Sequence, residues 1–312
     1  MNSIIRAGLT AALTLPLSLP AAASTLVSLP AGTHSLQASF GGPQATPKSV
    51  LNNLLRHRTK KTAHFAFPYG VAVDGAGNLY VTNVNSNSVS IVSAEYKFST
   101  TTITQGLSEP VGVALDTNDN LYVANDTGNI NKFNSSFALL QTITANAINP
   151  ASIAVDQAQD IWIVSQTGEL AVDDPYGNSI WTAIFGGSPQ LFSVAIGAPN
   201  VYTFYSDGGA FGDISVGLRG NTLQYIVGPL SSEEPLGAAC SQTQSLCWTG
   251  DTTNETLTEA TLPGSGFSQS IGYQPAGLAV DPVRNRLYVA DPINNAVHVY
   301  NASSLAFEKT LT

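Results

Sequence analysis

The chain has little charge: 11% of its 312 residues are Asp, Glu, Lys or Arg, and no acidic residue precedes Asp74. Asn, Ser, Thr and Gln must therefore supply much of the polar surface, a composition common among exported β-rich proteins. From residue 68 onward the chain carries six basic and 21 acidic residues, a net charge of −15. Because such a body repels phosphate backbones, we do not expect nucleic acid as a partner.

Long apolar runs are missing except at the N-terminus. Arg6 precedes an apolar stretch from Ala7 to Leu19, and a run of alanines follows that ends at Ala23. The stretch is too short to cross about 30 Å of hydrocarbon comfortably, and small residues after it fit a signal peptidase site. We predict a signal peptide over residues 1–23, a mature chain without a transmembrane segment, and a secreted, periplasmic or cell-surface location.

The dominant signal is a repeat of about 40 residues. Four clear copies read PYGVAVDGAGNLYVTN at 68–83, PVGVALDTNDNLYVAN at 110–125, PASIAVDQAQDIWIVS at 150–165 and PAGLAVDPVRNRLYVAD at 275–291. Degenerate copies begin at residues 191 and 235, and a final copy runs to Thr312. Six copies tile the chain, so the period defines a single repeat domain.

Each copy contains the pattern of four short strands. Runs such as Val71–Val73 and Leu79–Val81 flank an Asp and Gly/Asn turn, and further β-rich segments follow. The first two strands are apolar on both faces, as in a blade packed between two others. We predict an all-β, six-bladed β-propeller of four-stranded antiparallel blades over residues 68–312, closed without a strand from the N-terminal region and monomeric.

The repeats resemble a known family. The P-x-G-V-A-V-D step, the G-N-L-Y-V run and the N-x-V-x-V segment are similar to NHL repeats, and LYVTNVNSNSVSIV also resembles the YVTN repeat of cell-surface propellers. The resemblance implies six blades. It also places gluconolactonase-like enzymes, amidating lyases and purely binding sensor domains among the relatives, so the fold alone does not choose a function.

An aspartate recurs at the end of each first strand, at Asp74, Asp116, Asp156 and Asp281. A carboxylate ring for metal or acid–base chemistry is one interpretation. Asp also accepts backbone hydrogen bonds in tight turns, and a catalytic residue has no reason to recur in every blade. We expect these four residues to be structural.

The other ends of the strands should line the mouth of the central channel. In the gluconolactonase-like enzymes, the resemblance implies metal ligands at the x of the P-x-G step. The equivalents here offer no carboxylate, amide or imidazole, so we predict no metal and no cofactor; they are Tyr69, Val111, Ala151, Phe192, Leu236 and Ala276. The residues after the second strands are Asn83, Asn125, Ser165, Tyr205, Gly250 and Asp291. We expect ligand contacts from Tyr69, Asn83, Asn125, Tyr205 and Asp291.

Residues with catalytic or redox chemistry are scarce. His298 is the only histidine after residue 68, and G-x-S-x-G, H-E-x-x-H, a phosphate-binding Gly-rich loop and EF-hand spacing are all missing. We expect His298 at a blade edge, away from chemistry. The two cysteines, Cys240 and Cys247, fall on paired strands of one hairpin, which predicts a disulfide in an oxidising compartment. A metal pair or redox centre would need more ligands or C-x-x-C spacing.

Residues 24–67 lie outside the repeats and form a predicted linker. Within it, SVLNNLLRHRTKK at 49–61 has the pattern of a short basic amphipathic helix. It would dock on the acidic propeller, serve as a flexible or cleaved linker, or contact an anionic surface. We favour docking or a linker, because one short helix with five charges anchors weakly to membranes.

These features favour an exported, non-catalytic propeller that presents one loop face to a protein, glycan or small ligand. The alternative is a divergent lactonase-like or lyase-like enzyme with a divalent cation in its central channel, held by residues such as Asn125 and Asp291. A third hypothesis, suggested by the YVTN resemblance, is a component of a cell-surface or matrix array.

Overall fold

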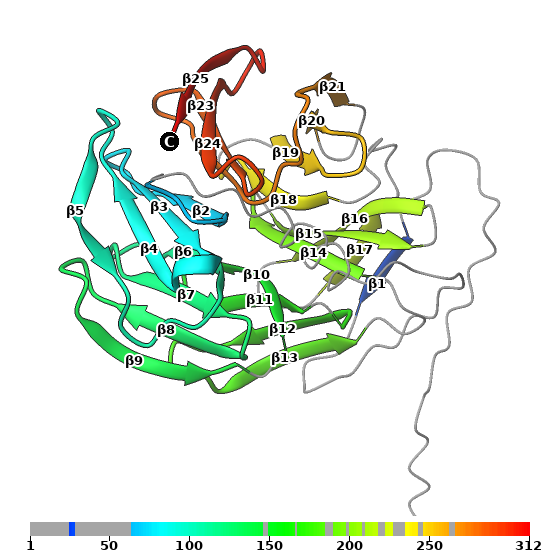
Figure 1. Cartoon of the computed structure of the whole chain (residues 1–312). Coiled ribbons are helices and arrows are strands. Elements are labelled where there is room, and N and C mark those ends of the chain that lie inside the picture. The colour runs from blue at the N-terminus through cyan, green and yellow to red at the C-terminus, as the bar shows by residue number, and fades with distance from the viewer. Residues whose placement is uncertain are drawn as a thin grey trace, which may run out of the picture.

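The computed structural model describes residues 25–28, 64–145, 149–165, 167–184, 190–197, 200–207, 210–217, 222–226, 235–242, 246–261 and 266–312. Of residues 25–28, 100, 184, 190–192, 200–207, 210–217, 222–226 and 235 the backbone alone is described. The strands pair into six antiparallel sheets arranged around a central channel (Figure 1).

Each repeat contributes one sheet. The first three contain β2 (Pro68–Val73), β3 (Leu79–Asn83), β4 (Ser88–Val92) and β5 (Phe98–Ile103); β6 (Pro110–Leu115), β7 (Leu121–Asn125), β8 (Asn129–Phe133) and β9 (Leu139–Thr144); and β10 (Pro150–Val155), β11 (Ile161–Ser165), β12 (Glu169–Asp173) and β13 (Ser179–Ile184). A short 3-10 helix, η1 (Val84–Ser86), follows β3.

The last three repeats follow the same order. Their sheets contain β14 (Gln190–Ile196), β15 (Asn200–Asp207), β16 (Ala210–Gly217) and β17 (Thr222–Ile226); β18 (Pro235–Cys240), β19 (Leu246–Asp251), β20 (Thr256–Thr261) and β21 (Gly266–Ser270); and β22 (Leu278–Asp281), β23 (Arg286–Asp291), β24 (Ala296–Asn301) and β25 (Phe307–Leu311). A further strand, β1 (Thr25–Ser28), comes from the N-terminal region.

The innermost strands form a ring of neighbours. Along the chain, β2, β6, β10, β14, β18 and β22 each contact the next, and β22 contacts β2. The predicted all-β propeller of antiparallel sheets is therefore confirmed. The prediction of six four-stranded blades is wrong, because five sheets have four strands and the remaining sheet has five.

The fifth strand of that sheet is β1, which pairs antiparallel with β17 from Thr25 opposite Tyr225 to Ser28 opposite Thr222. An outer strand such as β17 offers an unpaired row of backbone N–H and C=O groups, which any extended segment can satisfy. The N-terminal region thus supplies a strand that the sequence did not predict, although the ring closes without it, as expected. This strand lies on the outer edge of a sheet, and not at the seam where the ring closes.

The recurring aspartates hold the inner hairpins. The Asp116 carboxylate accepts hydrogen bonds from the Asn120 backbone N–H at 2.9 Å and from its side-chain Nδ2 at 2.8 Å. Asp74 binds Asn78 in the same way, at 2.8 Å for both contacts. Asp156 and Asp281 likewise accept backbone N–H groups of their own turns. The structural role expected for these four residues is confirmed.

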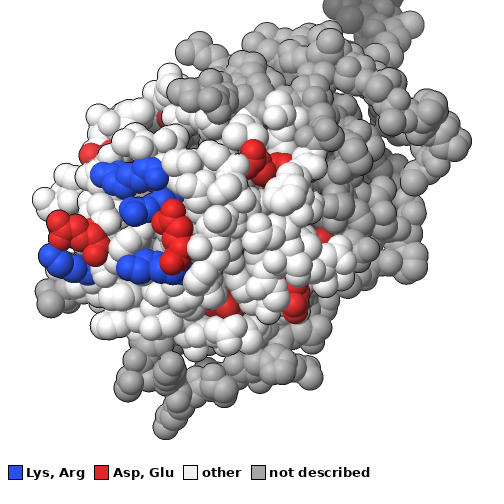
Figure 2. Space-filling view, turned by 90° about the horizontal axis from the view of Figure 1, so that it is seen from above, with Lys and Arg blue, Asp and Glu red and all other residues white. Residues whose placement is uncertain are grey.

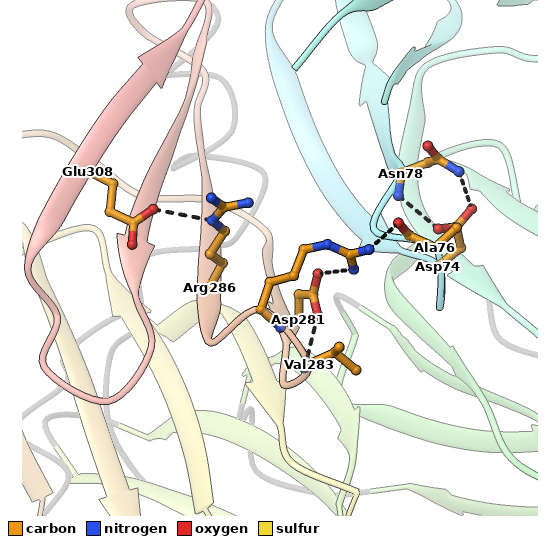
Figure 3. A network of polar contacts seen from close by, with 8 residues as sticks. Asp74, Ala76, Asn78, Asp281, Val283, Arg286 and Glu308 are labelled. Carbon is orange, nitrogen blue, oxygen red and sulfur yellow. Dashed lines mark hydrogen bonds and ion pairs between the residues drawn. The ribbon is translucent and has the colours of Figure 1, made fainter. Parts of the chain in front are cut away.

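The ring closes between the first and last sheets. The Gly277 N–H donates to the Tyr69 carbonyl at 2.8 Å, which joins the two inner strands. Toward the hairpin end of the sheets, Arg284 binds the Asp281 carboxylate at 2.9 Å and donates to the Ala76 carbonyl at 2.6 Å (Figure 3). The same view shows Arg286 reaching Glu308, at 3.3 Å.

The packed core begins before residue 68. Phe65 and Phe67 are buried in a cluster with residues of the first and last sheets, so the core extends into the end of the predicted linker. The predicted signal peptide and the basic segment at 49–61 lie outside the described residues. Among the described residues, no helix is long and apolar enough to cross a membrane.

The predicted disulfide is confirmed. Cys240 and Cys247 lie directly opposite each other on β18 and β19, with 4.0 Å between their Cα atoms. The bond therefore fastens the inner hairpin of a sheet whose repeat is among the most degenerate in sequence.

Basic side chains gather on one part of the surface, interleaved with acidic ones (Figure 2). Arg286 and Lys309 flank the ring of Tyr96, at 5.1 and 4.3 Å from its centroid. Lys97 pairs with Glu95 at 2.6 Å. Each basic group thus already has a carboxylate or an aromatic ring beside it.

Candidate functional site

The predicted ligand contacts at the ends of the second strands are buried. Asn83 and Asn125 are 1% exposed and Asp291 is 0% exposed. The Asn125 amide accepts a hydrogen bond from the Ser108 N–H at 2.9 Å and donates to the Asn131 side chain at 2.7 Å. Asn83 similarly accepts from the Ala66 N–H. These three residues therefore do not face solvent, because their polar groups secure loops and neighbouring strands.

The two tyrosines of the predicted set differ in position. Tyr69 is buried in an apolar cluster that also contains Val111, Leu236 and Ala276, the equivalent residues of three other repeats. Burial, with a smaller contribution from Asp126, raises the pKa of Tyr69 above its ordinary range. Tyr205 lies on β15 opposite Leu191, and its side chain is outside the described ones.

The ring of second-strand residues needs one correction. In the fifth repeat Pro235 pairs with Asp251, and Gly250 pairs with Gly237. The same register shift occurs in other repeats, as between Pro110 and Gly112, so the difference comes from one extra residue in the fifth inner hairpin. Asp251 therefore takes the position expected for Gly250, and its carboxylate accepts the Thr253 and Asn254 N–H groups of the following turn.

The central channel contains a cavity of about 200 Å³. Its described lining is dominated by Gly, Ala, Val, Ile and Leu, and Tyr69, Ser152, Ser193 and Gln242 are its polar side chains. Each inner strand is paired on one side only, so its other edge presents backbone groups to the channel. Among the described residues, no group of three His, Cys, Asp or Glu side chains converges on a metal position. The described channel wall thus contains no carboxylate or imidazole side chain.

A second cavity, of about 280 Å³, lies between the last two sheets. We call it the β21–β25 groove. It is lined by Gln269, Ser270, Ile271, Tyr273, His298, Tyr300, Phe307 and Thr310. The first four residues belong to β21 and the segment after it, and the last four to β24 and β25. Two different repeats therefore form its walls.

Aromatic rings make up much of this groove. The His298 ring lies 4.2 Å from the Tyr273 ring and 6.1 Å from the Phe307 ring, measured between centroids. Tyr300 meets Phe307 edge to face at 5.7 Å. Phe307 is 56% exposed and Phe267, two residues before Gln269 on β21, is 61% exposed. Exposed large apolar side chains beside a cavity are typical of a binding surface.

Two phenol groups of the groove contact each other. The Tyr273 and Tyr300 hydroxyls lie 3.0 Å apart. Burial raises the pKa of both phenols, and for Tyr273 the neighbouring Tyr300 and Asp291 raise it further. These hydroxyls are therefore neutral hydrogen-bonding groups and not bases.

His298 joins the groove to the interior of the last sheet. Its Nε2 lies 3.0 Å from the Asp291 carboxylate and its Nδ1 lies 3.0 Å from the Thr310 hydroxyl. Asp291 also accepts hydrogen bonds from the Asn294 backbone and side chain. An Asp–His–hydroxyl chain is the arrangement that activates a nucleophile in many enzymes.

In other sheets, residues at the positions equivalent to Asp291, His298 and Thr310 are hydrogen-bonded to one another without a histidine. Asn125 binds Asn131, which binds Thr142 at 3.1 Å. In the fifth repeat, the Thr258 and Ser268 hydroxyls lie 2.8 Å apart. The polar chain across strands two, three and four is therefore a structural feature of these sheets. His298 differs because its ring also lines a cavity.

The sequence indicated only part of this site. Asp291 was expected as a ligand contact, whereas His298 was expected at a blade edge and the other lining residues were not identified. No motif marks them, because they lie on neighbouring repeats and meet only when the sheets pack. The alternation of aromatic residues in AVHVYN at 296–301 is the one local signal.

No family model matches the chain, and no curated protein matches it. Solved structures do. The chain is similar to virginiamycin B lyase from Staphylococcus aureus, with a TM-score of 0.59, 13% identity, and 80% of this chain and 86% of that chain covered. It is similar to hydrazine synthase from Kuenenia stuttgartiensis, with a TM-score of 0.58, 14% identity, and coverage of 78% and 79%.

A third similar structure is a streptogramin B lyase, with a TM-score of 0.59, 12% identity, and 81% of this chain and 85% of that chain covered. Identities this low carry the fold and not the activity. The comparisons leave the resemblance to NHL repeats a prediction, and they establish that the chain has the β-propeller fold of these proteins.

Proposed function

We propose that this protein is an exported, non-catalytic, six-bladed β-propeller that binds a small neutral ligand or glycan in the β21–β25 groove. The five-stranded sheet counts as the fourth blade, since its inner strand β14 contacts both β10 and β18. A relationship to NHL repeats is part of the proposal. The Cys240–Cys247 disulfide supports an oxidising compartment, and hence export.

One observation carries the binding role: a cavity between two blades combines four aromatic or imidazole rings with amide and hydroxyl groups. Ligand sites are concave, largely apolar, and equipped with a few oriented polar groups. The channel mouth, where the sequence predicted binding, is less suitable because Tyr69, Asn83, Asn125 and Asp291 are buried.

A screen of neutral fragments by ligand-observed NMR against the mature protein tests this function. Fragments that bind the wild-type protein should show no binding signal with the variant Phe307→Ala, which removes an exposed ring from the groove. Tyr176→Ala is the matched control, since Tyr176 is 75% exposed and lies in the turn before β13, outside the groove. Binding that is unaffected by Phe307→Ala would place the ligand elsewhere and contradict the proposal.

A second candidate is a lactonase-like or lyase-like enzyme. The Asp291–His298–Thr310 chain favours it, because it joins a buried carboxylate, an imidazole and an exposed hydroxyl. Elemental analysis of protein never exposed to chelator, together with lactone and ester substrates, tests this candidate. If this candidate is correct, a lactone or ester is turned over and His298→Gln abolishes the turnover. A metal-dependent enzyme should also contain about one ion per chain, and Asn125→Ala or Asp291→Ala should release that ion. Turnover that survives His298→Gln would rule out a catalytic role for the hydrogen-bonded Asp291–His298–Thr310 series.

A further inference from the structure

We infer that the ligand of the β21–β25 groove is a neutral saccharide, with one sugar ring packed against the aromatic wall at Phe307. This inference rests on the proposed function, since it specifies the ligand class of the same groove. Three properties of the groove support it: its lack of Asp, Glu, Lys and Arg side chains, its mixture of rings and hydrogen-bonding groups, and its size and access to solvent.

The groove offers a ligand no carboxylate, ammonium or guanidinium group, and its one imidazole, His298, lies 3.0 Å from the Asp291 carboxylate. None of its eight lining residues is Asp, Glu, Lys or Arg. The nearby Asp291 carboxylate is 0% exposed and already accepts hydrogen bonds from Asn294 and His298. On β25, Glu308 pairs with Arg286, and Lys309 lies over Tyr96. A charged ligand would lose its hydration without gaining a counter-charge, which is unfavourable.

The lining also argues against a purely apolar ligand. Gln269, Ser270 and Thr310 present an amide and two hydroxyls at the groove. An apolar ligand would cover the Gln269 amide and the Ser270 hydroxyl without supplying partners, at a cost for each group left unsatisfied. A sugar ring has an apolar C–H face that can pack on an aromatic ring, and hydroxyls around its rim that can pair with amide and hydroxyl groups. It satisfies both parts of the lining.

The dimensions suit a small unit of a longer chain. At about 280 Å³ the cavity lies near the lower limit of typical ligand pockets, which is roughly 300 Å³. Ser270, Phe307 and Thr310 are exposed, so the groove opens to solvent along its outer side. A glycan can therefore place one ring in the cavity while the neighbouring sugars continue over the exposed rings.

The test uses the full mature protein and neutral di- to tetrasaccharides built from glucose, galactose, mannose and N-acetylglucosamine, with isothermal titration calorimetry as the readout. At least one should bind. Phe307→Ala should weaken it on the order of tenfold, as expected for the loss of one aromatic contact. Phe307→Tyr keeps the ring and should retain binding, and Tyr176→Ala is the control for an exposed aromatic outside the groove.

Thermal unfolding of each variant checks that the fold is intact. If no saccharide of the panel binds, or if Phe307→Ala and wild type bind equally, the saccharide inference is overturned. If neutral fragments bind in a Phe307-dependent way while the saccharides do not, the inference fails and the proposed function survives. If neither class binds at Phe307, both fail.

Discussion

The backbone N–H of Phe67 donates a hydrogen bond of 2.7 Å to the side-chain oxygen of Asn295, 228 residues away. Asn295 lies in the turn between β23 and β24, and Phe67 directly precedes β2. Asn87 makes the corresponding bond to the Glu109 N–H, also at 2.7 Å, between the first and second blades. The same type of asparagine contact thus joins the first and second blades, which the chain connects directly, and the first and last blades, where the ring closes.

Replacing Asn295 by Gly should loosen the closing seam. Asn295 has φ 52°, which Gly adopts without strain, so the variant removes the hydrogen bond and little else. We expect a loss of about 1–2 kcal/mol in the free energy of unfolding, measured by guanidinium denaturation. Hydrogen exchange should also quicken at β2 and β22.

Asn87→Gly is the matched control, because Asn87 has φ 49° and loses an equivalent bond. It should cost similar stability without the faster exchange at β22, since the chain itself still connects the first two blades. Equal exchange at β22 in the two variants would contradict a specific role for Asn295 in closure.

The glycine of the P-x-G step serves blade packing. At Gly277 an added Cβ would collide with the Tyr69 carbonyl oxygen, and at Gly70 it would lie 2.5 Å from the Val111 carbonyl oxygen. Gly277→Ala should therefore force the first and last blades apart and lower the free energy of unfolding by about 1–3 kcal/mol. Gly75→Ala meets open space and should change it little, so an equal loss in both variants would refute this explanation.

These contacts indicate how far the sequence determines the fold. The repeated P-x-G step and hairpin aspartates predicted the inner strands well, because each repeat encodes its own turn and its own contact with the next blade. The sequence did not indicate β1, because Thr25–Ser28 has no repeat pattern and pairs through its backbone with β17. A segment recruited by backbone pairing leaves little trace in its side chains.

The functional site was harder to predict for a related reason. Asn125 and Asp291 occupy equivalent positions, and both were expected to face a ligand, yet both are bound within their own blades. The groove arises where Tyr273 from one repeat meets His298 from the next. Periodicity identifies what the repeats share, whereas this site depends on how two of them differ.

The disulfide should stabilise the degenerate fifth blade. Closing the short loop between Cys240 and Cys247 is worth about 2–3 kcal/mol in the chain-entropy picture. The double variant Cys240→Ala, Cys247→Ala should lose about that much, and reductant should lower the stability of wild type but not of the variant. Wild type that is indifferent to reductant, with free thiols verified, would show that the bond contributes nothing to folding.

Buried tyrosines should make the protein sensitive to alkali. Burial, helped by nearby aspartates, raises the pKa of Tyr80, Tyr122 and Tyr273 in the folded state. Because these phenols ionise near pH 10 once unfolded, the free energy of unfolding should hold steady below that pH and fall as the pH rises above it. The tyrosinate absorbance of these three residues should therefore appear together with unfolding.

Tyr122→Phe provides the control for this titration. The Tyr122 hydroxyl makes only a long contact of 3.4 Å with Asp116, so its removal should disturb the fold little. With one fewer raised phenol, the variant should lose stability less steeply between about pH 10 and 12 than wild type does. If tyrosines in the folded protein instead titrate together near pH 10, before any loss of circular dichroism, then burial does not protect them and the blades are open to water.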